Sequence, residues 1–150
     1  MPTEPHGPLL KVCSLLNAES AEYIVVGAWA LILNNVIRAT EDVDILIAEN
    51  AENYLKVIKA LSRLEDGAAA ELKPEDFENN VVVKIADEVE VDVSRRAWSV
   101  TFGEAAPNAQ RASVDGIEIP YLSVADLIRS KQTQRDQDRI DLEMLLRLQK

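Results

Sequence analysis

Apolar and polar positions follow two different periods along the first half of the chain. Helical spacing marks residues 8–19 and 51–64, where apolar side chains recur every three or four positions, and a further helix is expected over residues 28–34, ending at Asn34-Asn35. Short apolar runs at Tyr23–Val26 and Val43–Ala48 predict buried strands between these helices. The chain therefore alternates helix and strand as far as residue 64.

The second half contains two hairpin patterns. Residues 81–86 and 89–94 form two runs separated by Asp87-Glu88, which makes them a hairpin candidate. Residues 112–119 flank Asp115-Gly116, a pair that favours a two-residue turn. The expected strands are 81–86, 89–94, 112–114 and 117–119.

The remaining segments complete the predicted fold. We expect a loop around Pro74, a helix or loop over residues 95–103, a helix capped by Ser123, and a last helix over residues 134–148. Because hairpins and crossover connections occur together, the predicted fold class is α/β (α+β), a mixed β-sheet flanked by helices, with C-terminal helices.

Size and composition predict one domain. The chain has 150 residues, of which 47% are apolar and 28% charged, so we treat residues 1–150 as a single domain with a disordered tail at 1–7. The longest apolar run, Tyr23–Leu33, is too short to span a bilayer, and the first residues do not resemble a signal peptide. The lone Cys13 has apolar neighbours, which indicates a buried thiol and fits the reducing cytoplasm.

The formal net charge of −10 is unevenly distributed. Residues 129–150 contain six basic and four acidic residues, so the acidic excess lies in residues 1–128. An acidic surface repels nucleic-acid backbones. The balance favours a phosphate-bearing small molecule bridged by metal ions, while a tRNA acceptor stays open.

Asp42 and Asp44 mark the start of one predicted strand. Alternation directs Val43, Ile45 and Ile47 to the core and both carboxylates to the other face, with their Cα atoms roughly 6.5 Å apart. Two such carboxylates repel each other unless a cation neutralises them, and two-metal sites use such pairs. Acidic pairs are common in so acidic a chain, so a solvated strand face is the alternative.

Asp92 repeats this pattern on a later strand, where Val91 and Val93 face inward. If that strand pairs beside the first, Asp92 lies near Asp42 and Asp44. There it could complete a metal site and accept a proton from an attacking hydroxyl. A polar edge-strand face is the alternative interpretation.

Further residues are of types that contact phosphate. Gly27 joins a buried strand to a helix, where glycine lets phosphate approach the backbone, although a plain tight turn is equally compatible. Arg38 and Thr40 precede the aspartates and could contact phosphate, while Thr40 could instead cap a turn.

Lys131, Arg135 and Asp138 fall at i, i+4 and i+7, the spacing of one helical face. Cations on that face could hold a triphosphate tail. An ordinary salt-bridged surface, with Arg135 beside Asp138, is the alternative.

Taken together, these segments resemble the nucleotidyltransferase superfamily, which has the polymerase-beta-like fold. The resemblance covers about residues 21 to 148. Three segments match the family most clearly, and these segments are VVGAWA, RATEDVDILI and LSVADLIRSKQTQRDQDRIDLEML. They look most like the small bacterial AbiEii-like group and its antibiotic-modifying relatives.

The resemblance implies roles for these residues. Asp42, Asp44 and Asp92 would be the catalytic acids and would hold two Mg²⁺ ions, with Asp92 also acting as base. Gly27 and Ala28 would border the triphosphate of an NTP, although the family has Gly or Ser where this chain has Ala28. The predicted phosphate contacts are completed by Arg38, Thr40, Lys131 and Arg135, with Asp138 orienting the last two.

The implied function is metal-dependent transfer of NMP from an NTP to a hydroxyl acceptor, in a bacterial toxin–antitoxin or defence system. A small hydroxylated compound, a protein side chain and a tRNA end are all open as acceptors, and a partner protein or homo-oligomer is compatible. The alternative is a catalytically degenerate nucleotide- or partner-binding module, such as an antitoxin.

Overall fold

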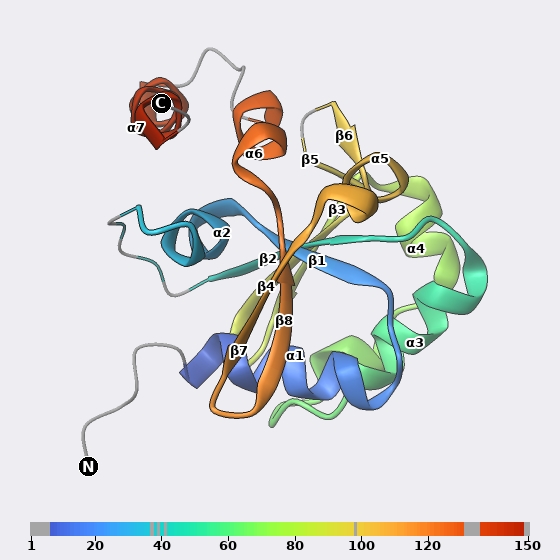
Figure 1. Cartoon of the computed structure of the whole chain (residues 1–150). Coiled ribbons are helices and arrows are strands. Elements are labelled where there is room, and N and C mark those ends of the chain that lie inside the picture. The colour runs from blue at the N-terminus through green and yellow to red at the C-terminus, as the bar shows by residue number, and fades with distance from the viewer. Residues whose placement is uncertain are drawn as a thin grey trace.

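The computed structural model of the chain is built around a six-stranded mixed sheet with strand order β3-β4-β2-β1-β8-β7 (Figure 1). The structure describes residues 7–36, 38, 40, 42–97, 99–130 and 136–148. The strands of this sheet are β1 (Tyr23–Val26), β2 (Val43–Ile47), β3 (Val82–Ala86), β4 (Glu90–Ser94), β7 (Gln110–Val114) and β8 (Ile117–Tyr121). A separate two-stranded sheet consists of β5 (Arg96–Ala97) and β6 (Val100–Thr101).

Helices cover both faces of the large sheet. The first face packs against α1 (Gly7–Ala18), α3 (Ala51–Leu61) and α4 (Pro74–Asn79). The second face packs against α5 (Phe102–Ala105), α6 (Val124–Ser130) and α7 (Asp136–Leu148), while α2 (Gly27–Leu33) contributes to both clusters. Two short 3-10 helices, η1 (Ala68–Glu71) and η2 (Ala106–Asn108), complete the described elements. This arrangement confirms the predicted mixed α/β fold class.

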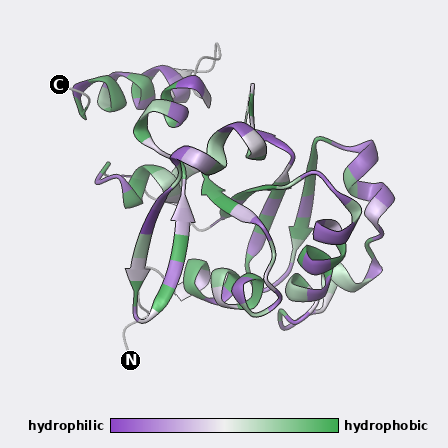
Figure 2. Cartoon of the chain, turned by 45° about the vertical axis from the view of Figure 1, so that its right-hand side comes forward, coloured by the Kyte–Doolittle hydropathy of each residue, from purple (hydrophilic) through white to green (hydrophobic). Residues whose placement is uncertain are grey.

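The central strand β1 is buried on both sides. Tyr23 and Val25 belong to the apolar cluster of the first face, and Ile24 and Val26 belong to that of the second. A strand covered on both faces reads as a continuous apolar run instead of an alternating one, as this segment does. Figure 2 shows hydrophobic residues in the central strands, while the surrounding helices alternate between hydrophobic and hydrophilic residues.

The second predicted hairpin forms as expected. Asp115 and Gly116 both have positive φ, at 51° and 80°, as a type I′ turn between β7 and β8 requires. The following helix is also capped as predicted, because the Ser123 hydroxyl oxygen accepts a hydrogen bond from the Asp126 N–H at 3.2 Å.

The prediction of a loop around Pro74 is wrong, because this segment contains α4. Pro74 occupies the start of the helix, where its missing N–H has no consequence. The Asp76 carboxylate accepts a hydrogen bond from the Lys73 N–H at 2.8 Å. Phe77 is buried in the core of the first face. This single anchor and the capping contact stabilise a helix too short to show a clear period.

The prediction of a helix or loop over residues 95–103 is wrong at β5 and β6, where Arg96 pairs with Thr101. It is correct at Phe102 and Gly103, which begin α5. Two-residue strands carry no alternation that a sequence pattern could reveal. The two-stranded sheet places α5 over the second face, where Val100 and Ala105 are buried.

The remaining expectations concern Cys13 and the chain termini. Cys13 is fully buried as predicted, and burial raises the pKa of its thiol to about 12. Residue 7 begins α1, and the rest of the predicted tail lies outside the described residues. None of the helices in the described part of the chain has the length and apolar content needed to cross a bilayer.

Candidate functional site

The candidate site is a row of residues that crosses four neighbouring strands. Val26 of β1 pairs with Asp44 of β2, Asp44 pairs with Asp92 of β4, and Asp92 pairs with Lys84 of β3. Directly paired residues point to the same face, and neighbouring strands lie roughly 4.8 Å apart. The structure therefore places β4 parallel to and directly beside β2, so that Asp44 and Asp92 are adjacent. Their catalytic role stays a prediction.

Asp92 is the least satisfied carboxylate of this row. Its side chain is 18% exposed, and its Oδ1 is buried without a hydrogen-bond partner among the described residues. Its Oδ2 lies 3.8 Å from the Lys84 ammonium. An ionised carboxylate can only accept hydrogen bonds, and a buried acceptor without a donor is costly. The site is therefore chemically suited to binding a cation.

Gly27 lies against Asp44 at the end of β1. Its φ is +65°, a left-handed conformation that favours glycine. A Cβ atom at this position would lie 2.1 Å from Asp44 Oδ2, far inside van der Waals contact. The glycine turn is thus required both by backbone conformation and by the room that the Asp44 carboxylate needs. Ala28 follows in the first turn of α2 and is partly exposed.

Asp42 stands apart from the adjacent pair. It precedes the first residue of β2, is exposed, and its carbonyl accepts a hydrogen bond from the Thr40 hydroxyl at 3.3 Å. Within the described ranges, no group of three or more His, Cys, Asp or Glu side chains is arranged to hold a metal ion. The structure thus brings two of the three predicted acids together, and the participation of Asp42 stays a prediction.

The comparison with protein families covers residues 9–146, nearly the whole chain. The matching family is described as nucleotidyltransferases of unknown function (DUF6036). The chain belongs to this family. This finding confirms the predicted nucleotidyltransferase superfamily.

Two solved structures are similar to the DUF6036 chain. A candidate nucleotidyltransferase from Thermotoga maritima has a TM-score of 0.53 and 16% identity, covering 93% of this chain and 88% of that one. An antigenic nucleotidyltransferase-like protein from Paracoccidioides brasiliensis has a TM-score of 0.55 and 18% identity, and the match covers 93% of this chain and 74% of that one. At such identities the similarity shows the fold alone, and the AbiEii-like subgroup stays a prediction. A search of curated proteins found no match.

Arg38 of the DUF6036 chain is engaged in an ion pair. Its Nη1 lies 2.6 Å from Asp141 Oδ2, and the Asp141 side chain is 1% exposed. The pair connects the segment before β2 to α7. A contact of Arg38 with phosphate, as predicted, would have to compete with this buried carboxylate.

The predicted cationic helix face falls largely outside the residues that the structure describes. Lys131 and Arg135 lie outside the described residues, so their predicted phosphate contacts stay predictions. Asp138 is described, on α7, and is buried. Trp29, which follows the glycine turn, is buried in the core of the first face.

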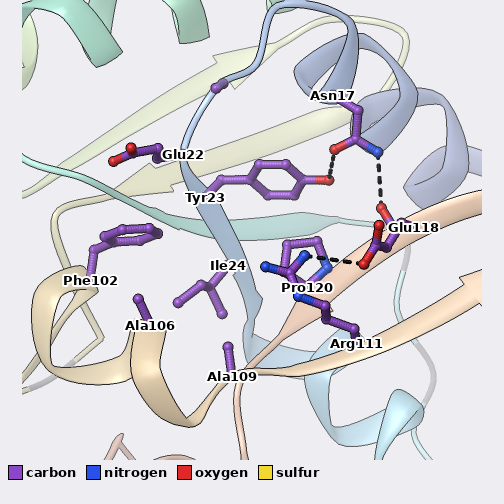
Figure 3. Close-up of a pocket in the computed structure, with 11 residues that line it drawn as sticks. Asn17, Glu22, Tyr23, Ile24, Phe102, Ala106, Ala109, Arg111, Glu118 and Pro120 are labelled. Carbon is purple, nitrogen blue, oxygen red and sulfur yellow. Dashed lines mark hydrogen bonds and ion pairs between the residues drawn. The ribbon is translucent and has the colours of Figure 1, made fainter.

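A cavity of about 350 Å³ lies elsewhere and is lined by residues of α1, β1, α5, η2, β7 and β8 (Figure 3). Its lining includes Tyr23, Ile24, Phe102 and Pro120 but neither Asp44 nor Asp92. Tyr23 is three residues from Val26 along β1, which corresponds to roughly 10 Å. The candidate site is therefore the carboxylate row, where Asp44 and Asp92 are directly paired.

The polar groups in this cavity bond to one another. The Tyr23 hydroxyl donates a hydrogen bond to Asn17 Oδ1 at 2.8 Å, and Asn17 Nδ2 donates to the Glu118 carbonyl at 2.9 Å. Arg111 and Glu118 form an exposed ion pair at 3.3 Å. These contacts engage Tyr23, Asn17, Arg111 and Glu118 with one another.

Sequence reasoning missed Lys84 and Asp141. The predicted hairpin could not have placed Lys84, because a two-residue turn at Asp87-Glu88 would pair Val83 with Asp92. In the structure Ala86 pairs with Glu90, which shifts the register by one residue and sets Lys84 opposite Asp92. Asp141 carries no sequence signal, because an acidic residue on a polar helix normally faces solvent. Only the folded chain shows its contact with Arg38.

Proposed function

We propose that this chain is a metal-dependent nucleotidyltransferase, which transfers NMP from an NTP to a hydroxyl acceptor. The observation that carries the proposal is the adjacency of Asp44 and Asp92 beside the Gly27 turn, in a chain of the nucleotidyltransferase family. Two adjacent carboxylates next to a turn with accessible backbone combine a cation site with room for phosphate.

The side chains present fit Mg²⁺, the ion that the proposal requires. Carboxylate oxygens are the ligands that this hard cation prefers, and Asp92 Oδ1 is a buried acceptor to which no described residue donates a hydrogen bond. Asp44 and Asp92 would hold the ions, with Asp42 joining them from the segment before β2. Bound Mg²⁺ would neutralise negative charge on the phosphate oxygens during transfer.

The residues of the chain would orient the reactants and move one proton. The acceptor oxygen forms a bond to the α-phosphorus while the bond to pyrophosphate breaks. Asp92 accepts the proton of the acceptor hydroxyl, because a carboxylate at the reacting centre is a suitable base. Gly27 leaves the space in which Asp44 and the phosphates approach each other.

Asp92→Asn and Asp44→Asn test this function. With α-labelled NTPs, Mg²⁺ and acceptors of the three open classes, we expect label transfer by the native chain and a loss of at least about 100-fold in either variant. Asp115→Asn, in the exposed β7–β8 turn, is the control and should transfer normally. Because Asp92→Asn removes a poorly satisfied charge, its thermal stability should equal or exceed that of the native chain. Absence of both Mn²⁺ binding and NTP binding in the native chain would overturn the proposal.

A second candidate function is a nucleotide- or partner-binding module without turnover. The position of Asp42 outside the Asp44–Asp92 pair and the presence of Ala28 in place of Gly or Ser favour it. This function predicts that the native chain binds NTP and Mn²⁺ but transfers no label to any acceptor class.

The biological setting that we propose is a bacterial toxin–antitoxin or defence system in the cytoplasm. The reducing compartment is supported by a single cysteine that is buried and unreactive. Expression of the native chain and of Asp44→Asn in a bacterial host tests the toxin role, because only an active transferase should arrest growth.

A further inference from the structure

Lys84 supplies a cation at the end of the carboxylate row. It lies on β3, an outer strand of the sheet, directly opposite Asp92 of β4. Its Nζ is 3.8 Å from Asp92 Oδ2, and its side chain is 70% exposed. The same carboxylate is one that a metal ion at this site would use.

The contact between Lys84 and Asp92 is a weak one. An exposed ion pair at the upper limit of contact distance contributes little, because water screens the charges and a long side chain loses rotamer freedom. The ammonium is therefore tethered beside Asp92 without being fixed there. It partly offsets the repulsion between the neighbouring Asp44 and Asp92 carboxylates.

We propose that Lys84 is a built-in competitor for the divalent cation, so that metal binding at Asp44 and Asp92 depends on arrival of the nucleotide. This inference rests on the proposed function. Without nucleotide, the ammonium repels a divalent ion at the same carboxylate. The negative charges of a triphosphate offset that repulsion, so the ion and the nucleotide bind together. Binding of either one then strengthens binding of the other, since coupling between two ligands is reciprocal.

The ordinary explanation of Lys84 is different. Lysines on outer strands prevent edge-to-edge association of sheets, whatever lies beside them. That role requires only a charge exposed to solvent. It predicts no effect of Lys84 on metal affinity, so the two explanations separate in a binding experiment.

Mn²⁺ binding is the direct test, measured by electron paramagnetic resonance of free Mn²⁺. The native chain, Lys84→Met and Lys84→Arg are titrated with and without a non-hydrolysable ATP analogue. Without the analogue, we expect Lys84→Met to bind Mn²⁺ about 3- to 10-fold more tightly, and the strengthening caused by the analogue to shrink by a similar factor. Lys84→Arg keeps the charge and should behave like the native chain.

Lys59→Met is the matched control. Lys59 of α3 has a side chain that is 74% exposed, and its Nζ lies 3.5 Å from Glu19 Oε1. Its replacement therefore removes the same charge from a comparable surface position. Its Mn²⁺ affinity should be that of the native chain. Thermal melting of each variant establishes that the fold is intact.

The outcomes separate this inference from the proposed function. Equal Mn²⁺ affinity in the native chain and Lys84→Met, or equal tightening in Lys59→Met, overturns the role of Lys84 and leaves the proposed function standing. No Mn²⁺ binding by any variant, with or without the analogue, overturns the proposed function and the inference together.

Discussion

At the residue scale, the candidate site depends on one glycine and two carboxylates. Gly27 is held in a left-handed conformation, and the Asp44 carboxylate fills the space where a side chain at position 27 would stand. The turn and the acid are therefore a single structural unit. A substitution at Gly27 should affect both backbone stability and the position of Asp44.

Gly27→Ala should destabilise the fold and disturb metal binding. Left-handed backbone in a non-glycine residue costs about 1–3 kcal/mol, and the new methyl group must displace Asp44 Oδ2. Urea unfolding measures the first effect and Mn²⁺ titration measures the second. Gly103→Ala is the control, because its Cβ would meet nothing within 4 Å. Native-like stability together with native-like Mn²⁺ affinity in Gly27→Ala would contradict this account.

At the element scale, α7 is attached to the segment that leads into the site. Its Leu145 is buried in the core of the second face, and its Asp141 pairs with Arg38 just before β2. α6 is its neighbour on the same face. The last helix is thus linked to the segment before β2 through the Arg38–Asp141 ion pair.

Arg38→Met should loosen α7. Removal of the guanidinium leaves the Asp141 carboxylate buried without this partner, and we expect a loss of about 2 kcal/mol, since one side of the pair is partly exposed. Hydrogen exchange should increase in α7 more than in β1. Arg147→Met, exposed in the last turn of α7, serves as the control. Unchanged exchange in α7 would show that Arg38 does not hold this helix.

At the scale of the whole molecule, a polar network near the β3–β4 turn ties distant segments together. Lys11 of α1 donates to Glu88 at 2.6 Å, and Glu88 also accepts from the Glu65 N–H. Asp87 accepts from the N–H groups of Asp66 and Ala68. The network joins α1, the segment after α3 and the hairpin that carries Asp92.

This network changes the pKa values of its carboxylates. The Lys11 hydrogen bond, followed by the Glu65 N–H, lowers the pKa of Glu88 below 4.5. Burial raises the pKa of Asp87, but the backbone donors of Ala68, Asp66 and Glu88 outweigh it and lower that pKa below 3.8. In both cases the folded state favours the charged form.

The free energy of unfolding should therefore decrease as the pH is lowered in the acid range. A lowered folded pKa gives stability that is present above the unfolded value and lost as pH falls through the folded value, below 4.5 for Glu88 and below 3.8 for Asp87. Urea unfolding between about pH 6 and about pH 3 should show a smaller acid-dependent loss in Asp87→Asn than in the native chain. Asp115→Asn, in an exposed turn, is the control. An identical acid dependence in Asp87→Asn and the native chain would exclude this contribution.

Most helices and strands could be predicted from short sequence patterns, because their formation depends on interactions between neighbouring residues. The apolar run at Tyr23–Val26, the Asp115-Gly116 turn and the Ser123 cap each depend on a few neighbouring residues. α4 and the β5–β6 pair were not predicted because each is too short to show a periodic pattern. Each is stabilised by contacts with residues outside the element itself.

The sequence by itself indicated most of the strands and helices, which side of β2 and β4 is acidic, and that a glycine turn follows β1. These properties follow from side-chain alternation and backbone conformation, which act over a few residues. Only the tertiary structure decided that Asp44 adjoins Asp92, that Lys84 extends their row, and that Arg38 reaches Asp141. Strand order and helix docking result from burial of the whole core, and no single segment contains that information.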